Sequence, residues 1–189
     1  MQLDLAERYI MKRLTEELSP DLTYHNSAHT RDVYLATQQI AAQEGVSDQA
    51  LQLLLTAALF HDAGFLIHAK NHEVHSCSIA QRALPSFGYS EADIASICDL
   101  ILATEIPQQP KHHLDEILCD ADLDYLGRDD FPARSQLLYE EMRKLGTIAS
   151  RTAYDELQRA FFESHHYFTA TSNRLRNKKK EENYQKLIA

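Results

Sequence analysis

The sequence contains few of the residues that interrupt helices. Glycine and proline each occur only five times in 189 residues, which is too few for the many tight turns of an all-β fold. Alanine, leucine, glutamine and glutamate, which favour helices, are plentiful. With 44% hydrophobic and 25% charged residues, the chain has the composition of a globular protein that can bury a core. We therefore expect an all-α fold.

Cysteine is also scarce. The three residues Cys77, Cys98 and Cys119 are scattered and form no CxxC pair, which argues against a disulfide framework and a thiolate zinc site. We expect them to be reduced and buried, as in a cytoplasmic protein. No apolar run approaches the length that crosses a bilayer, so we expect no membrane association.

Positive charge is concentrated at the C-terminus. The net charge is −9, and residues 171–189 hold six basic and two acidic residues, so the preceding body carries about −13. An acidic body repels phosphate backbones, and we expect no nucleic-acid partner. The basic segment at about 171–187 is predicted to be a solvated terminal helix, with a docking helix as the alternative. It gives no indication of oligomeric state.

Hydrophobic periodicity predicts a single-domain bundle of about eight or nine helices over residues 1–189. No internal repeat, linker or long low-complexity segment divides the chain. Most glycines and prolines fall at or near the breaks between the predicted helices. These helices cover about 3–18, 27–44, 47–62, 71–84, 90–104, 113–126, 129–145, 148–165 and 171–187.

The second predicted helix carries an inward histidine. Val33, Ala36 and Ile40 form one apolar stripe, and the position four residues before Val33 is His29. A single inward histidine is more often a core residue with one hydrogen bond than a ligand. His29 alone therefore identifies no site.

The third predicted helix is apolar on nearly every face and ends in His61-Asp62. A carboxylate at the negative pole of a buried helix costs several kcal/mol unless it has a partner. A bound cation would remove this conflict. The alternative is that His61 and Asp62 bond to each other or cap a neighbouring helix.

The sixth predicted helix holds three aspartates. Asp122 and Asp124 border its apolar stripe on opposite sides, whereas Asp120 lies further round toward solvent. Periodicity does not choose between Asp122 and Asp124. Together with the two histidines, these carboxylates would form a mixed N/O ligand set that suits Mn²⁺, Fe²⁺, Co²⁺, Ni²⁺, Zn²⁺ or Mg²⁺.

Three ordered motifs carry a resemblance to a known family. Residues 24–33 (YHNSAHTRDV), 60–65 (FHDAGF) and 119–124 (CDADLD) resemble, in that order, the motifs of the HD-domain superfamily of metal-dependent phosphohydrolases. The resemblance covers about 24–127 and implies a helical bundle with a metal at its centre. It favours Asp122 over Asp124, because the last ligand usually follows a small residue. The implied ligands are His29, His61, Asp62 and Asp122.

Many members of the superfamily bind a second ion through two further histidines. In this sequence the matching stretch before the final ligand ends in Thr104. The resemblance therefore implies one divalent ion per chain, unless His72, His112 or His113 replaces the missing ligands.

Three further residues are candidates for the pocket. Residues 71–73 resemble the segment that brings a His or Glu to the pocket in relatives, and His72 and Glu73 are the candidates here. The alternative is a polar helix start that suits Glu73. Lys70 precedes this helix and is a candidate phosphate contact, or part of a surface loop. His25, with Tyr24, is predicted to anchor the start of the second helix.

The resemblance predicts a phosphohydrolase that cleaves a phosphomonoester or phosphodiester with metal-activated water. The expected substrate is a small phosphorylated molecule, a nucleotide or a related metabolite. Asp62 or Asp122 would accept a proton, and His72 or Lys70 would stabilise charge on the phosphate. The alternatives are a non-catalytic nucleotide- or metal-binding regulatory module, a two-iron oxygenase of the same superfamily, and a helical interaction protein.

Overall fold

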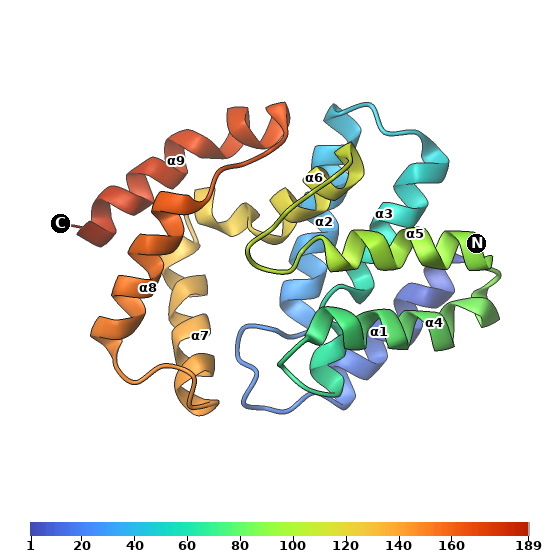
Figure 1. The fold of residues 1–189 in the computed structure, drawn as a ribbon, viewed down its shortest axis with the longest axis horizontal. Helices are drawn as coiled ribbons and strands as arrows, with labels where there is room; N and C mark the ends of the chain where they lie inside the picture. The colour runs from blue at the N-terminus through green and yellow to red at the C-terminus, as the bar shows by residue number, and fades with distance from the viewer. Residues whose placement is uncertain (189) are drawn as a thin grey trace.

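The computed structural model describes residues 1–188 and confirms the predicted all-α fold, with nine α-helices, three short 3-10 helices and no strand in this range (Figure 1). The α-helices are α1 (Leu3–Glu16), α2 (Ser27–Gln43), α3 (Asp48–Phe60), α4 (His72–Ala83), α5 (Glu91–Leu102), α6 (His113–Asp122), α7 (Phe131–Lys144), α8 (Arg151–Ser164) and α9 (Ala170–Ile188). The 3-10 helices are η1 (Ala63–Leu66), η2 (Leu84–Phe87) and η3 (Asp124–Gly127).

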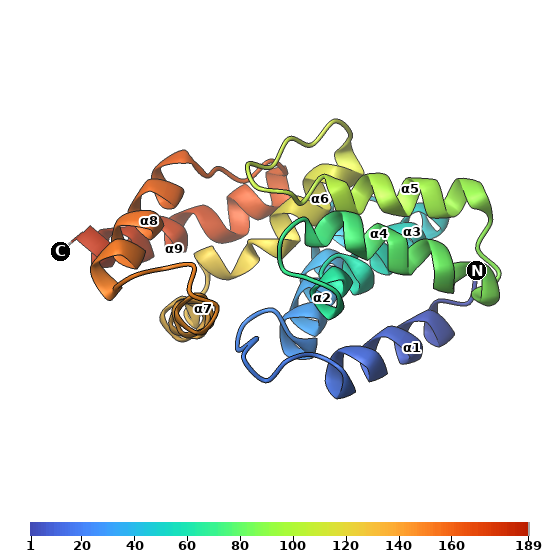
Figure 2. The same ribbon diagram turned by 60° about the horizontal axis from the view of Figure 1, so that its bottom comes forward.

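Helices α1 to α6 form the body that carries the predicted motifs. Helix α2 packs against α3 and α6, α3 also packs against α1 and α5, and α4 lies along α5 (Figures 1 and 2). Their apolar faces share one buried cluster, to which the predicted central helix α3 contributes Leu54, Leu59 and Phe60. All of residues 54–60 are buried, as expected for a helix that is apolar nearly all round.

Helices α7, α8 and α9 lie to one side of this body, and the two chain ends lie at opposite ends of the molecule (Figure 1). A second apolar cluster joins them to η3 and includes Tyr125, Phe131 and Phe162. Helix α9 packs against η3 so closely that a Cβ atom at Gly127 would overlap the backbone of Arg176. The basic C-terminal segment is therefore a helix with one packed side.

Local sequence signals explain where the helices near the motifs begin. The Asn26 side chain accepts hydrogen bonds from the backbone N–H groups of Ala28 and His29, at 2.9 and 3.4 Å, and so caps α2. Ser90 and Asp93 form a reciprocal capping box at the start of α5. The Asn26 cap fixes the first turn of α2, which carries His29.

Two helices end earlier than their periodicity predicts. Helix α3 ends at Phe60 rather than Asp62, and the predicted helix 113–126 divides into α6, which ends at Asp122, and η3. The Leu123 carbonyl, at this division, accepts a hydrogen bond from the Tyr167 hydroxyl at 3.2 Å. As a result, Asp62 lies just beyond the end of α3 and Asp122 is the last residue of α6. At these positions the direction of a side chain is less constrained by helical geometry than inside a helix.

The prediction that Asp120 faces solvent is wrong. Its side chain is 0% exposed and accepts hydrogen bonds from the Phe168 N–H at 2.9 Å and from the N–H and hydroxyl of Thr169 at 2.9 and 2.7 Å. The segment between α8 and α9 covers this face of α6. Because a distant part of the chain provides the cover, the periodicity of α6 alone cannot reveal it.

Two other predictions from composition have a direct structural counterpart. The three cysteines are free and buried, which confirms their predicted state. Of the helices formed by residues 1–188, none combines the length and apolar character that a bilayer crossing requires.

Candidate metal centre

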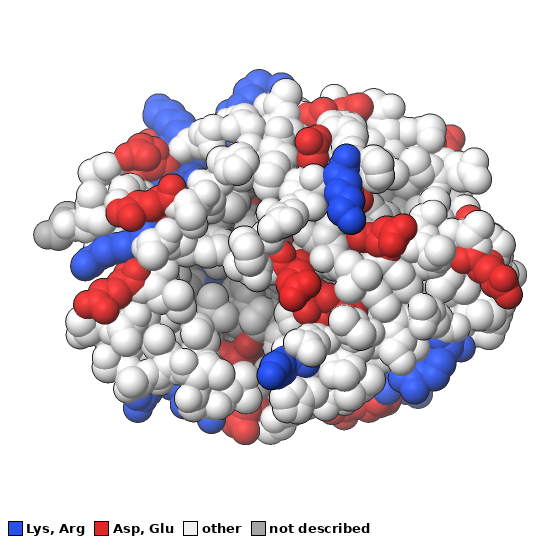
Figure 3. Space-filling view, viewed as in Figure 1, with Lys and Arg blue, Asp and Glu red and all other residues white. Residues whose placement is uncertain are grey.

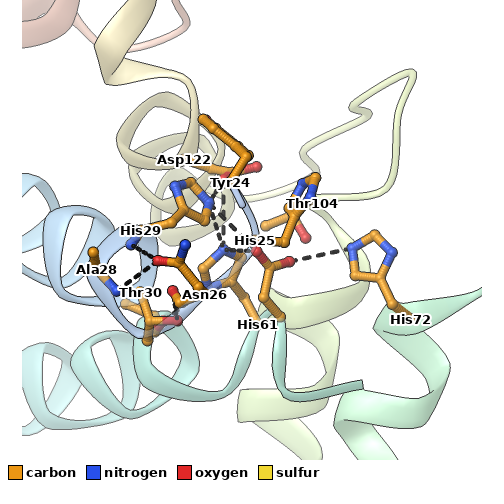
Figure 4. Close-up of polar contacts among 12 residues, drawn as sticks. Tyr24, His25, Asn26, Ala28, His29, Thr30, His61, His72, Thr104 and Asp122 are labelled. Atoms are coloured by element: carbon orange, nitrogen blue, oxygen red, sulfur yellow. Dashed lines mark hydrogen bonds and ion pairs between the residues drawn. The ribbon is translucent and has the colours of Figure 1, made fainter. Parts of the chain in front are cut away.

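The four predicted ligands come together where α2, α3 and α6 meet. His29 Nε2 lies 3.1 Å from Asp122 Oδ1 and 3.4 Å from Asp62 Oδ2. His61 Nε2 lies 3.4 Å from His29 Nε2, 3.3 Å from Asp62 Oδ2 and 3.5 Å from Asp122 Oδ1. Figure 4 shows His29, His61 and Asp122 pointing toward one another. We call these four residues the His/Asp cluster.

The separations between these atoms suit a metal ion. Ligand atoms about 2.1 Å from a divalent ion lie about 3.0 to 3.5 Å apart in tetrahedral or octahedral arrangements. The distances from His29 Nε2 and His61 Nε2 to each other and to the two carboxylates fall between 3.1 and 3.5 Å. The ligand atoms of His29, His61 and Asp122 all lie within 4.8 Å of one another, a group of three that does not include Asp62.

The backbone of α3 orients the His61 ring. His61 is the C-cap residue of α3, and its Nδ1 lies 2.8 Å from the Ala58 carbonyl oxygen. A carbonyl only accepts, so Nδ1 carries the proton and a neutral ring presents a lone pair at Nε2 toward the cluster. The Ser76 hydroxyl donates to the His61 carbonyl at 2.6 Å and fixes the backbone from α4. This arrangement is typical of a metal-binding histidine.

The surroundings of the Asp62 carboxylate test whether these residues fit a cation. The Oδ2 atom of Asp62 is buried and has no hydrogen-bond partner among the described residues. A buried carboxylate oxygen without a partner costs several kcal/mol. Since Oδ2 faces both Nε2 atoms of the cluster, a cation between them would satisfy all three groups. The residues present therefore fit a divalent ion.

The electrostatics of the cluster favour positive charge. Burial alone would lower the pKa of His61, but the carboxylates of Asp62 and Asp122 outweigh it and raise the pKa well above its usual value. Burial alone would raise the pKa of Asp62, but His61 and His72 hold it well below its usual range. Asp122 likewise has a lowered pKa, because His29 and His61 outweigh burial. The carboxylate field that raises the pKa of His61 also attracts a metal cation.

Two of the three other predicted pocket residues lie beside the cluster. His72 Nε2 is 3.3 Å from Asp62 Oδ1 and 3.3 Å from Glu73 Oε1. Gly64 allows this approach, because a Cβ atom there would overlap the His72 backbone. Lys70, in contrast, is exposed and forms no ion pair with a described residue. Among the predicted pocket residues, Lys70 alone is not brought to the cluster.

Thr104 and the two later histidines occupy different surroundings. Thr104 is buried beside the cluster (Figure 4), and its hydroxyl donates to the Ile101 carbonyl at 2.8 Å. His113 instead contacts Glu116 and Glu44, at 2.9 and 3.3 Å, and His112 is the N-cap residue of α6. Neither histidine points into the cluster.

His25 is a site residue whose role the sequence did not indicate. It does precede α2, as predicted for an anchor, and Glu141 of α7 accepts the backbone N–H groups of Tyr24 and His25 at 2.8 and 2.9 Å. His25 Nδ1 also contacts the Glu141 carboxylate. The ring stacks on Phe65, with centroids 4.4 Å apart, and lines the cavity beside the cluster. In the sequence, only its closeness to His29 indicates that His25 lies near the cluster. Its partner Glu141 is 116 residues further along the chain, so no local pattern links the two.

A cavity of about 300 Å³ opens beside the His/Asp cluster. Asp62, Asp122, His25, His72 and Glu73 contribute to its wall, and η3, α7 and α8 supply mainly apolar side chains. Cavities of this kind, with a few convergent polar groups, are typical of small-molecule sites. The cluster is thus accessible to a ligand of limited size.

A larger cleft of about 610 Å³ lies elsewhere, between α2, η3 and α9. Its basic side chains are already paired: Arg128 with Asp32 at 3.1 Å and with Asp130 at 2.6 Å, and Arg176 with Asp124 at 2.6 Å. We therefore assign the functional site to the smaller cavity, which contains the unsatisfied carboxylate.

The all-helical fold and the His/Asp cluster between its central helices are the features of a helical protein that can hold a metal ion. The family model of the HD domain matches residues 26–124, more than half of the chain, and the chain belongs to this family. The match contains all four predicted ligands. Family membership and the cluster support a metal-dependent hydrolase.

Solved structures share the fold. A predicted HD superfamily hydrolase from an uncultured Thermotogales bacterium is 22% identical, with a TM-score of 0.58, and the alignment covers 96% of this chain and 86% of that one. A Lactobacillus plantarum protein is 20% identical, with a TM-score of 0.68 and coverage of 99% and 95%. Bacillus subtilis YpgQ, in complex with ADP, is 19% identical, with a TM-score of 0.67 and coverage of 99% and 94%. No curated protein sequence matches the chain significantly.

Proposed function

We propose that the protein hydrolyses a phosphate ester, a monoester or a diester, of a nucleotide or a related small metabolite. One divalent ion would be held by His29, His61, Asp62 and Asp122. The observation that carries this proposal is the unpartnered Oδ2 of Asp62, which faces two imidazole nitrogens at the wall of a cavity. The ADP complex of YpgQ supports a nucleotide-like phosphate as the substrate class.

When bound at the cluster, a divalent ion lowers the pKa of coordinated water and polarises a phosphoryl oxygen. Asp62 or Asp122 can accept the proton that such water loses. Asp62 Oδ1 lies 3.3 Å from His72 Nε2, so His72 holds the Asp62 carboxylate at the edge of the cavity. The contact between Asp62 and His72 thus connects the cluster to the edge of the cavity.

His72 and Glu73 lie where they can position the phosphate. Burial alone lowers the pKa of His72, but Asp62 and Glu73 outweigh it, so the pKa is raised and the imidazolium is favoured. The positive charge of a protonated His72 can balance the charge of a phosphoryl group beside it, while its Nδ1 and Nε2 are held by Ala69, Asp62 and Glu73. Glu73, which is buried, holds His72 from the same turn of α4. Lys70 remains a candidate only if its exposed side chain reaches the cavity when a phosphate is bound.

His25 is suited to protonate the leaving oxygen. Its Nδ1 is held by Glu141, which leaves Nε2, on the opposite side of the ring, for a ligand. Burial alone lowers the pKa of His25, but Glu141 and Asp62 raise it, so the protonated ring is favoured. A histidine held by a buried carboxylate in this way can act as a general acid.

Metal analysis and a phosphatase assay test the proposal together. The purified protein should contain about one divalent ion per chain and release phosphate from phosphorylated metabolites when that ion is supplied. The Asp122→Asn variant should lose both the ion and the activity, whereas Asp129→Asn, which changes an exposed aspartate, should keep both. Substrate binding without phosphate release would instead indicate a regulatory module. Two irons per chain and oxygen consumption would indicate an oxygenase.

A further inference from the structure

We propose that the cavity beside the His/Asp cluster binds an uncharged, apolar, ring-sized group of the substrate, while the phosphoryl group lies at the cluster. This inference rests on the proposed phosphohydrolase function and specifies which organic group the ester carries. It follows from the side chains of the cavity wall, from the distribution of charge along that wall, and from exposed apolar side chains that also line the cavity.

Most of the cavity wall is apolar. Three elements outside the metal cluster supply it: η3 and the residue before it, α7 and α8. Their side chains include several aromatic rings, which pack well against a flat group. The apolar wall residues from these elements are Leu123, Tyr125, Leu126, Leu138, Met142, Tyr154, Leu157, Phe161 and Phe162.

The charged groups gather at the cluster. Asp62 and Asp122 belong to the His/Asp cluster, and His72 contacts both Asp62 and Glu73. None of the described residues that line the cavity is a lysine or an arginine. Along the wall formed by η3, α7 and α8, away from His25 and His72, a second anionic group on the substrate would lose its hydration without meeting a cation. The organic group is therefore expected to be uncharged.

The polar groups that α8 contributes to the wall, on Gln158 and Tyr154, already have hydrogen-bond partners. Gln158 donates to the Tyr154 hydroxyl at 2.8 Å and accepts from the Ser135 hydroxyl at 2.9 Å. The Tyr154 hydroxyl donates to the Ser135 carbonyl at 2.8 Å. These groups need no hydrogen bond from a ligand. Shape and apolar contact, rather than polar recognition, should select the organic group.

Two large apolar side chains of the wall are exposed to solvent. Leu157 of α8 is 47% exposed, and Ile106 of the loop after α5 is 52% exposed. Figure 3 shows this face hollowed between the α7–α9 side and the body, with acidic side chains near the hollow. A ligand in the cavity would cover apolar surface that the fold leaves open. About 300 Å³ is at the lower end of the range of small-molecule pockets, which suits one or two rings.

Binding of three phosphonates to the metal-loaded protein tests this inference by calorimetry. Benzylphosphonate should bind at least about tenfold more tightly than methylphosphonate, because burying a ring is favourable by more than about 1.4 kcal/mol. Adding a charge to that ring, in 4-carboxybenzylphosphonate, should weaken binding at least about tenfold. Equal affinities of benzylphosphonate and methylphosphonate would overturn the inference.

A lysine placed in the wall provides the second measurement. Met142 is half-buried in α7 and lines the cavity, and lysine has a similar unbranched stem that keeps its charge near water. Met142→Lys should strengthen binding of 4-carboxybenzylphosphonate and weaken binding of benzylphosphonate. The control Leu137→Lys, at an exposed position of the same helix outside the cavity wall, should change neither. Identical responses of the two variants would contradict the assignment of this wall.

The binding readout is independent of turnover. If benzylphosphonate binds as expected but no phosphate ester is hydrolysed, the subsite stands and the proposed hydrolase function fails. If phosphate is released from methyl and aromatic esters with the same KM, the hydrolase function stands and the apolar subsite is wrong.

Discussion

Glu141 joins α7 to the segment that precedes α2, and its replacement should affect both stability and activity. The carboxylate is 2% exposed. It accepts the backbone N–H groups of Tyr24 and His25 at 2.8 and 2.9 Å, and it contacts His25 Nδ1. In the Glu141→Ala variant, two backbone donors and one imidazole lose their partner at once.

The expected loss follows from these contacts. A buried donor left without an acceptor costs about 1–3 kcal/mol, and water can reach part of the His25 side chain. Glu141→Ala should therefore lower the free energy of unfolding by about 3 kcal/mol at pH 7. The pKa of Glu141 is lowered, because His25 and the two N–H groups outweigh burial. The folded-state pKa thus lies below the usual 4.5, and the loss should shrink as the pH falls below that value.

Urea unfolding of Glu141→Ala, with Glu140→Ala as the matched control, measures this loss. Glu140 is the exposed neighbour, whose carboxylate contacts only Gln136, so its replacement should cost less than about 0.5 kcal/mol. A loss below about 1 kcal/mol in Glu141→Ala would refute the argument that this carboxylate satisfies buried donors.

The Glu141→Gln variant separates positioning from folding. Its amide oxygen can still accept the two N–H groups, so the fold should be retained. His25, however, loses the carboxylate that raises its pKa. The alkaline limb of the kcat–pH profile should shift to lower pH, and kcat should fall about tenfold or more. A purely structural role for Glu141 would leave that profile unchanged.

Three further predictions concern the metal, pH and the segment after α8. A metal concentration of about 100 times Kd should stabilise the protein by about 2.7 kcal/mol and raise Tm by about 5–10 °C, and differential scanning calorimetry should show no such rise in Asp122→Asn. Burial, with Lys180 and His166 nearby, lowers the pKa of His165 from 6.5 to about 3, so its contribution is full above pH 6.5 and is lost as the pH falls toward 3. Replacing it in His165→Phe should remove up to about 2 kcal/mol of the stability loss between pH 7 and 5, whereas His166→Phe, at an exposed position, should not. Asp120→Ala should cost about 3 kcal/mol in urea unfolding, because it removes the acceptor of two N–H groups and a hydroxyl.

The helices and the inward position of His29, His61 and Asp62 could be predicted from the sequence because their signals are local. The apolar α3 ends in His61-Asp62, and His29 lies one turn before Val33 on the stripe of α2. Such patterns depend only on helical periodicity and on the poor placement of a carboxylate at a helix C-terminus. The resemblance to HD-domain motifs then favoured Asp122, whose side chain does face the cluster, while Asp124 pairs with Arg176.

Other features depend on contacts between distant parts of the chain. Asp120 is buried because residues 168 and 169 cover it, and His25 is held by a glutamate 116 residues further along. Helical periodicity also cannot predict the direction of the His25 side chain, because His25 precedes the first residue of α2. No local pattern predicts these pairings, because each requires knowing how α7 and the α8–α9 segment pack on the body.

The metal centre and the cavity wall come from different parts of the chain. The predicted ligands lie on α2, at the end of α3 and on α6, whereas η3, α7 and α8 supply most of the apolar side chains of the wall. Glu141 connects the two parts through His25 and Tyr24. Changes in the wall should therefore alter the organic group that binds while metal affinity is retained. Under the proposed function, the ordered His, His-Asp and Asp motifs hold the metal, and the organic group is selected by the α7–α8 sequence, which lies outside residues 26–124 matched by the family model.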